Sequence, residues 1–218
     1  MDEIQNLSLT IVNSNRIAGI LLVTSFLTLL TALIIMIASG AISAFPAILQ
    51  GSLAPMGPYI SIYRMDNFLY AIGWVLQILG FTLLTKSLIE TGSYIIALPA
   101  FIMILVAGIL GIFEASFHMS VTTWAIHQTV ETGSEPDFYP ALRQWAGTFQ
   151  LIYLILGLVA LVGFGGALLK IHLVPTWISI ASLVWGVAWL VALLFGVGIP
   201  AVLFIMPTVI GAALMLAK

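Results

Sequence analysis

The sequence predicts an all-α fold, a polytopic transmembrane bundle of about six helices that forms a single membrane domain over residues 1–218. Hydrophobic residues make up 62% of the chain and charged residues only 6%, whereas a soluble domain carries roughly a quarter charged residues. So few charges cannot build a water-exposed surface, but helices that face lipid need polarity only at their ends and at functional sites. We therefore expect a multi-pass protein of the cell membrane, with the lipid bilayer as a partner.

The composition also excludes several classes of protein. The chain has no cysteine, which excludes disulfides, thiolate metal sites and a cysteine nucleophile. The six Lys and Arg residues are scattered and the formal net charge is −2, so nucleic acid is not an expected partner. The sequence contains no His-Glu-x-x-His, Gly-x-Ser-x-Gly or P-loop motif, which removes the enzymes that depend on them.

Stretches of roughly 20 apolar residues define the predicted spans. The six spans cover residues 17–45, 68–85, 94–117, 145–169, 176–195 and 199–216. The two long outer loops are expected at residues 46–67 and 118–144.

The first span follows a polar Asn-Ser-Asn-Arg segment and ends at Pro46, because the residue before a proline is pushed out of helical geometry. It is longer than a bilayer requires, so we expect it to tilt or to emerge at one end. Residues 46–67 are rich in proline and glycine, a composition typical of a loop. The second span, 68–85, begins where the apolar residues resume.

The third span starts near Tyr94 and passes Pro99, which the first turns of a helix tolerate. The apolar character fades after Phe113, yet no helix-breaking residue follows until Gly133. The helix can therefore leave the membrane and continue, and the clearest loop is the polar segment 132–137.

The third, fourth and fifth spans contain small residues at helical spacing. Close backbone approach at small residues holds membrane helices together. The predicted contact positions are Gly163 with Ala167, Ala188 with Ala192, and, on the third span, Gly108 to Gly111. A Gly196-Val197-Gly198 turn joins the fifth and sixth spans.

The distribution of basic residues predicts the orientation, because cytoplasmic loops carry the excess of Lys and Arg. With the amino terminus inside, the outer side holds only Arg64 and Arg143. The inner side then holds Arg16, Lys86, Lys170 and Lys218. We therefore expect both termini in the cytoplasm.

Glu114 and His118 are the leading candidates for a functional site, because an ionisable group inside or at the edge of a span is costly. They are four residues apart, so one helix face carries both. At 1.5 Å per residue from Tyr94, Glu114 lies roughly 30 Å along its helix, at the outer edge of the hydrocarbon layer. The pair is expected to bind a proton or a polar substrate, or to be an ordinary interfacial ion pair.

His127 and Glu131 repeat the four-residue spacing farther along the chain. On a continuous helix, nine residues turn by about 900°, which places His118 and His127 on opposite faces. A site that used Glu114, His118 and His127 to bind a divalent metal, Zn²⁺ or Cu²⁺, would therefore need ligands from another segment. The candidates for these ligands on the outer side are Asp66, Asp137 and Tyr63.

The last third of the chain, from Gly163 onward, has an inner loop that ends in Val-Pro-Thr-Trp before the fifth span and a proline in the sixth. In these features it resembles bacterial six-span membrane proteins that are classified only as domains of unknown function. The resemblance covers about the last 60 residues. It implies six spans and a prokaryotic cell membrane, and it brings no functional residue or activity with it.

The sparse polarity favours a non-enzymatic membrane protein, either an accessory subunit of a membrane complex or a binder of lipid or another apolar molecule. Other membrane subunits or further copies of the chain would then be its partners. One alternative is a small carrier of protons, metal ions or weakly polar solutes that uses Glu114 and His118 at its outer face. The other alternative is a metal-dependent membrane enzyme that uses Glu114, His118 and His127.

Overall fold

The computed structural model describes residues 2–49 and 51–216, and every regular element within them is helical. The eight α-helices of this part of the chain are α1 (Asp2–Ala38), α2 (Phe45–Leu49), α3 (Ile60–Glu90), α4 (Tyr94–Phe117), α5 (Thr123–Thr132), α6 (Tyr139–Ile171), α7 (Thr176–Leu194) and α8 (Val202–Leu216). Short 3₁₀ segments cover Ala41–Ser43 and Ala54–Tyr59, and a π-helical segment covers His118–Thr122. The expected all-α bundle is confirmed.

Five stretches of the described chain are helical, long and apolar enough to cross a membrane. These stretches are Asn13–Ala38, Ala54–Glu90, Tyr94–Thr132, Tyr139–Ile171 and Thr176–Leu194. Helix α8 is also apolar but shorter, at 15 residues. The structure is therefore that of a membrane-embedded helical bundle.

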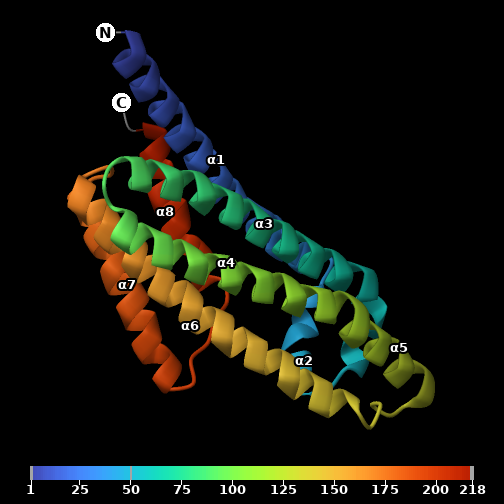
Figure 1. Ribbon diagram of the computed structural model, residues 1–218. Helices are drawn as coiled ribbons and strands as arrows, with labels where there is room; N and C mark the ends of the chain where they lie inside the picture. The colour runs from blue at the N-terminus through green and yellow to red at the C-terminus, as the bar shows by residue number, and fades with distance from the viewer. Residues whose placement is uncertain (1, 50, 217–218) are drawn as a thin grey trace.

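The long helices lie side by side, and each packs on its neighbours in a simple order (Figure 1). Helix α1 packs against α3 and α8, α4 lies between α3 and α6, and α7 packs against α6. The described chain begins and ends at the same end of the bundle, and α2 and α5 lie at the opposite end (Figure 1). We call this opposite end the α2/α5 end.

Several helices begin or end away from the predicted span boundaries. Helix α1 ends at Ala38 and not near residue 45, because Gly40 adopts a left-handed conformation with φ of 79°. Helices α3 and α6 begin at Ile60 and Tyr139, ahead of the predicted spans that start at residues 68 and 145. Hydropathy marks only the apolar part of a helix, so it misses the more polar turns that extend toward the α2/α5 end.

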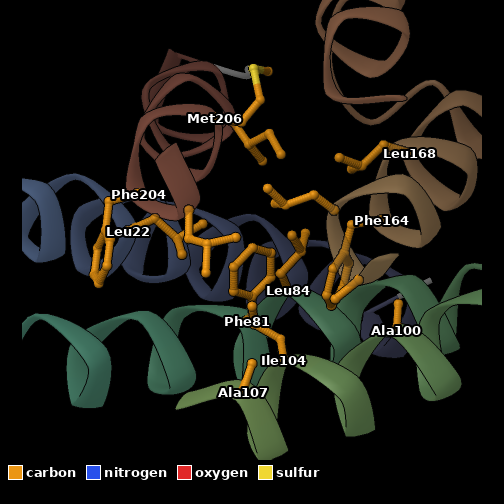
Figure 2. Close-up of a cluster of buried hydrophobic side chains, with 14 of the residues drawn as sticks. Leu22, Phe81, Leu84, Ala100, Ile104, Ala107, Phe164, Leu168, Phe204 and Met206 are labelled. Atoms are coloured by element: carbon orange, nitrogen blue, oxygen red, sulfur yellow. The ribbon is translucent and has the colours of Figure 1, made fainter. Parts of the chain in front are cut away.

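An aromatic and aliphatic core joins α3, α4, α6 and α8 (Figure 2). The rings of Phe81 and Phe164 stack with their centroids 4.4 Å apart. Nearby, the fully buried Trp74 contacts the rings of Tyr153 and Phe204 at centroid distances of 5.6 and 5.0 Å. This core fixes the relative positions of the helices that carry the candidate site.

Small residues allow these helices to approach closely, as expected for membrane helices. Gly108 and Gly111 receive the Trp74 indole of α3, and a Cβ at Gly163 would lie 2.8 Å from the Ala100 side chain of α4. The predicted Ala188–Ala192 contact is wrong, because Ala188 is exposed. Gly186 provides the contact of α7 instead, where a Cβ would lie 2.9 Å from the Leu158 carbonyl oxygen of α6.

Helix α8 contains Pro207, which cannot donate a backbone hydrogen bond to the carbonyl of Leu203 four residues earlier. The amide of Gln77 on α3 donates to that carbonyl instead, at 3.1 Å. The indole of Trp185 on α7 donates to the neighbouring Val202 carbonyl at 3.0 Å. Two other helices therefore hydrogen-bond the first turn of α8 inside an apolar core.

Candidate functional site

Glu114 faces the interior of the bundle and not the surface. Its exposed fraction is 7%, and its Oε2 accepts a hydrogen bond of 2.8 Å from the Tyr153 hydroxyl of α6. Tyr153 is fully buried and in turn accepts a hydrogen bond of 3.1 Å from the Tyr70 hydroxyl of α3. Because an ionised carboxylate only accepts hydrogen bonds, the chain runs from Tyr70 to Tyr153 to the ionised Glu114.

His118 lies next to Glu114 at the start of the π-helical segment. Its Nε2 is 3.9 Å from Glu114 Oε1, which is an ion-pair distance but too long for a hydrogen bond. Its Nδ1 lies 2.9 Å from the Tyr63 hydroxyl and 3.0 Å from the Thr122 hydroxyl. A neutral His118 that accepts a hydrogen bond at Nδ1 carries its proton on Nε2, directed toward Glu114.

The π-helical segment His118–Thr122 aligns these groups. A π-helical turn inserts one extra residue into a helix, and such turns occur frequently at functional sites. The Thr123 hydroxyl donates to the His118 carbonyl at 3.0 Å, and the Tyr139 hydroxyl of α6 donates to Thr122 at 3.1 Å. The helix then continues to Thr132 and ends at Gly133, which adopts φ of 76°.

These contacts join four segments into one polar network, which we call the Glu114 network. Its members are Tyr63, Tyr70, Glu114, His118, Thr122, Tyr139 and Tyr153. The carboxyl group of Glu114 and the imidazole of His118 can each accept and hold a proton, and the hydroxyl groups hydrogen-bonded to them orient both.

His127 and Glu131 form a separate ion pair at the surface. His127 Nδ1 lies 3.4 Å from Glu131 Oε2, and the two side chains are 65% and 59% exposed. Among the described residues, no three His, Asp or Glu side chains come together in a group that could hold a metal ion. Glu114, His118 and His127 are therefore not gathered into one site.

Asp66 lies apart from the Glu114 network on α3. It is half-buried, and within the described part of the chain it makes no hydrogen bond and no ion pair. The guanidinium of Arg64, two residues away, donates to the Met119 carbonyl at 3.2 Å. The Asp66 carboxyl instead lines a pocket together with Tyr70.

This pocket, which we call the α1/α3 pocket, has a volume of about 300 Å³. Its wall is almost entirely apolar and comes mostly from α1, with further side chains from the α1–α3 connection and from Ala201. The apolar residues of the lining include Phe26, Leu29, Leu33, Met36 and Phe45. Asp66 and Tyr70 supply the polar side chains of its lining.

Tyr70 belongs both to the α1/α3 pocket and to the Glu114 network. Its ring lines the pocket, and its hydroxyl donates to Tyr153, which donates to Glu114. A molecule that binds against Tyr70 would therefore lie two hydrogen bonds from the buried carboxyl.

Sequence reasoning named Tyr63 only as a possible metal ligand and missed Tyr70, Tyr139 and Tyr153, because a tyrosine near a span end is common and carries no sequence motif. One signal was present on α3. Tyr63 and Tyr70 are seven residues apart, a spacing that places both on one face of a helix. Helix packing alone brings Tyr139 and Tyr153 of α6 to the site, where they hydrogen-bond Thr122 and Glu114.

Comparison with known proteins adds nothing to this geometry: no family model, curated protein or solved structure matches the chain. The resemblance of the last third to bacterial six-span proteins therefore stays a prediction.

Proposed function

We propose that this chain is a six-span protein of the cell membrane that binds an apolar molecule in the α1/α3 pocket. The observation that carries the proposal is the pocket itself, a cavity of about 300 Å³ with an almost wholly apolar wall. Ligand pockets of about 300–1,000 Å³ are typically apolar, with a few polar groups that orient the ligand. In this pocket Asp66 and Tyr70 are the polar residues that would orient the ligand.

The sixth span would be α8. Its 15 residues extend about 22 Å at 1.5 Å per residue, which is less than a hydrocarbon core of about 30 Å. The preceding residues 195–201 would supply the remaining length. Because both ends of the described chain lie at the same end of the bundle, we expect an even number of membrane crossings (Figure 1). The distribution of Lys and Arg favours the cytoplasm for both termini. Of these basic residues, Lys218 lies outside the described residues.

The absence of cysteine provides a direct test of this topology, because single cysteines can be introduced without background. We expect Ser134→Cys and Val197→Cys to react in intact cells with a maleimide that does not cross membranes. Thr91→Cys should react only after the membrane is permeabilised. Labelling of Thr91→Cys but not Ser134→Cys in intact cells would invert the topology, and protection of Val197→Cys in intact cells would contradict the sixth span.

The binding proposal is tested by native mass spectrometry of the protein extracted gently from its own membrane. We expect the wild-type protein to retain a stoichiometric apolar molecule. Leu33→Trp should lose it, because Leu33 lines the pocket and the larger side chain fills it. The matched control is Leu27→Trp, because Leu27 lies on the same helix outside the pocket lining and is 48% exposed against 45% for Leu33.

Three results of this experiment would count against the proposal. Equal retention in Leu33→Trp and Leu27→Trp would place the molecule elsewhere. A stable partner subunit without a bound molecule would support the accessory-subunit interpretation. A lone chain that carries a metal ion would support the metal-enzyme interpretation.

A second candidate function is a small carrier in which Glu114 binds a proton. The observation that favours it is the position of Tyr70, which links the α1/α3 pocket to Glu114 through Tyr153. Occupation of the pocket and the proton on Glu114 would then influence each other. Acidic and histidine side chains within membrane helices commonly serve as proton relays.

A further inference from the structure

We infer that the molecule bound in the α1/α3 pocket is a lipophilic cation, with an ammonium group at Asp66 and a hydrocarbon body along α1. The inference rests on the proposed binding function and adds the chemical class of the ligand. Three features of the pocket support it: an unpaired carboxyl group, the absence of a free side-chain donor, and aromatic side chains in the same lining.

The first feature is the Asp66 carboxyl. It is half-buried in an apolar wall, yet within the described residues it has no hydrogen bond and no ion pair. A carboxylate in such surroundings is costly unless a counter-charge or a donor is close. The guanidinium Nε of Arg64 donates to the Met119 carbonyl instead. A cationic ligand would supply the missing counter-charge.

The second feature is the hydrogen-bonding character of the lining. Tyr70 has the only side-chain donor among the described lining residues, and its hydroxyl hydrogen is directed to Tyr153. Tyr153 cannot reverse that bond without giving up its own bond to Glu114. Among its side chains the pocket therefore presents only acceptors, the carboxylate of Asp66 and the remaining lone pair of Tyr70. Such a lining selects a cation or a donor and rejects carboxylates, phosphates and carbonyl groups.

The third feature is aromatic. The rings of Phe26, Phe45 and Tyr70 line the same pocket as the carboxyl. The face of an aromatic ring attracts an ammonium group, and this attraction strengthens when the cation is shielded from water. Aromatic side chains that share a pocket with one carboxyl group therefore suit a quaternary or protonated amine better than an uncharged head group. Leu29, Leu33 and Met36 would contact the hydrocarbon body.

The test compares three probes with the same alkyl chain but different head groups. Radiolabelled dodecyltrimethylammonium, dodecanol and dodecanoate are offered at low concentration to the protein in maltoside micelles, and binding is measured by equilibrium dialysis against empty micelles. For the wild-type protein we expect the cation to bind most tightly and dodecanoate least. This order needs no variant, so it tests the inference even if substitutions at Asp66 impair folding.

Substitutions then assign the selectivity to Asp66. Asp66→Asn keeps the shape but removes the charge, and we expect it to weaken binding of the cation at least about tenfold while dodecanol binding stays unchanged. Asp66→Glu should retain the preference for the cation. The control is Asp137→Asn, which removes the same charge from an exposed position outside the pocket and should bind all probes as the wild type does.

The outcomes separate this inference from the proposed function. If the cation and dodecanol bind equally and Asp66→Asn changes neither, while Leu33→Trp abolishes both, the pocket binds apolar molecules without regard to charge. In that case the inference is wrong and the proposed function stands. If Leu33→Trp leaves the binding of every probe unchanged, the pocket is not the binding site and both are wrong.

Discussion

Trp74→Ala is expected to lower the free energy of unfolding by about 3–5 kcal/mol, the usual cost of truncating a large buried aromatic side chain. Trp74 is fully buried and lies at the point where α3, α4, α6 and α8 meet. Its ring contacts Tyr70, Tyr153 and Phe204, so its removal would leave a cavity directly beneath the Tyr70–Tyr153 hydrogen bond. Equilibrium unfolding in mixed micelles titrated with SDS measures the change.

The control for this experiment is Trp177→Ala. Trp177 lies in the first turn of α7 and is 64% exposed, so its loss removes an aromatic side chain without opening a cavity. We expect it to change the free energy of unfolding by less than about 1 kcal/mol. Equal losses for the two variants would show that Trp74 does not hold the helices together as its contacts indicate.

Glu114→Gln is expected to reduce proton flux in proteoliposomes to the rate of protein-free liposomes, if the protein acts as a carrier. The glutamine keeps the size of the side chain and still accepts a hydrogen bond from Tyr153, but it cannot bind and release a proton. A pH indicator trapped inside the liposomes reports the flux after an external pH jump. Addition of the dodecyltrimethylammonium probe shows whether an occupied pocket alters it.

The chain contains its own matched control for this experiment. Glu131 pairs with His127 at the same four-residue spacing as Glu114 with His118, but it lies at the surface. Glu131→Gln should therefore retain the wild-type flux. Wild-type flux in Glu114→Gln would end the carrier hypothesis, and a loss in both variants would indicate a general effect of acidic residues at this end of the bundle.

The sequence predicted the helical bundle well, because the apolar composition leaves few alternatives to helices in lipid. The absence of a breaker between Phe113 and Gly133 also predicted the continuation of the third helix, which runs to Thr132. The ends of other helices were predicted less well. Pro46 was a plausible end for the first helix, but the left-handed conformation of Gly40 ends it earlier. Hydropathy does not indicate which of the two residues ends the helix.

The candidate site was predictable only where it lies within one helix. Glu114 and His118 are neighbours by helical spacing alone, and the structure places them 3.9 Å apart. Tyr70 and Tyr153 are 83 residues apart in the sequence and belong to different helices, so no local pattern could pair them. The same limit explains the Ala188–Ala192 error, because helical spacing shows that small residues share a face but not which neighbour that face contacts.

The π-helical segment His118–Thr122 has a consequence for how this region can change in length. Because the π-turn holds one surplus residue, every residue after it lies about 100° behind the angle that continuous α-helical spacing would give it. A single deletion between residues 118 and 122 would remove the surplus residue and restore regular α-helical geometry there, and His127 and Glu131 would keep their orientation relative to α4. A one-residue deletion within this segment should therefore be tolerated better than a one-residue deletion in the regular α-helical part of α4, which would turn all following residues by about 100°.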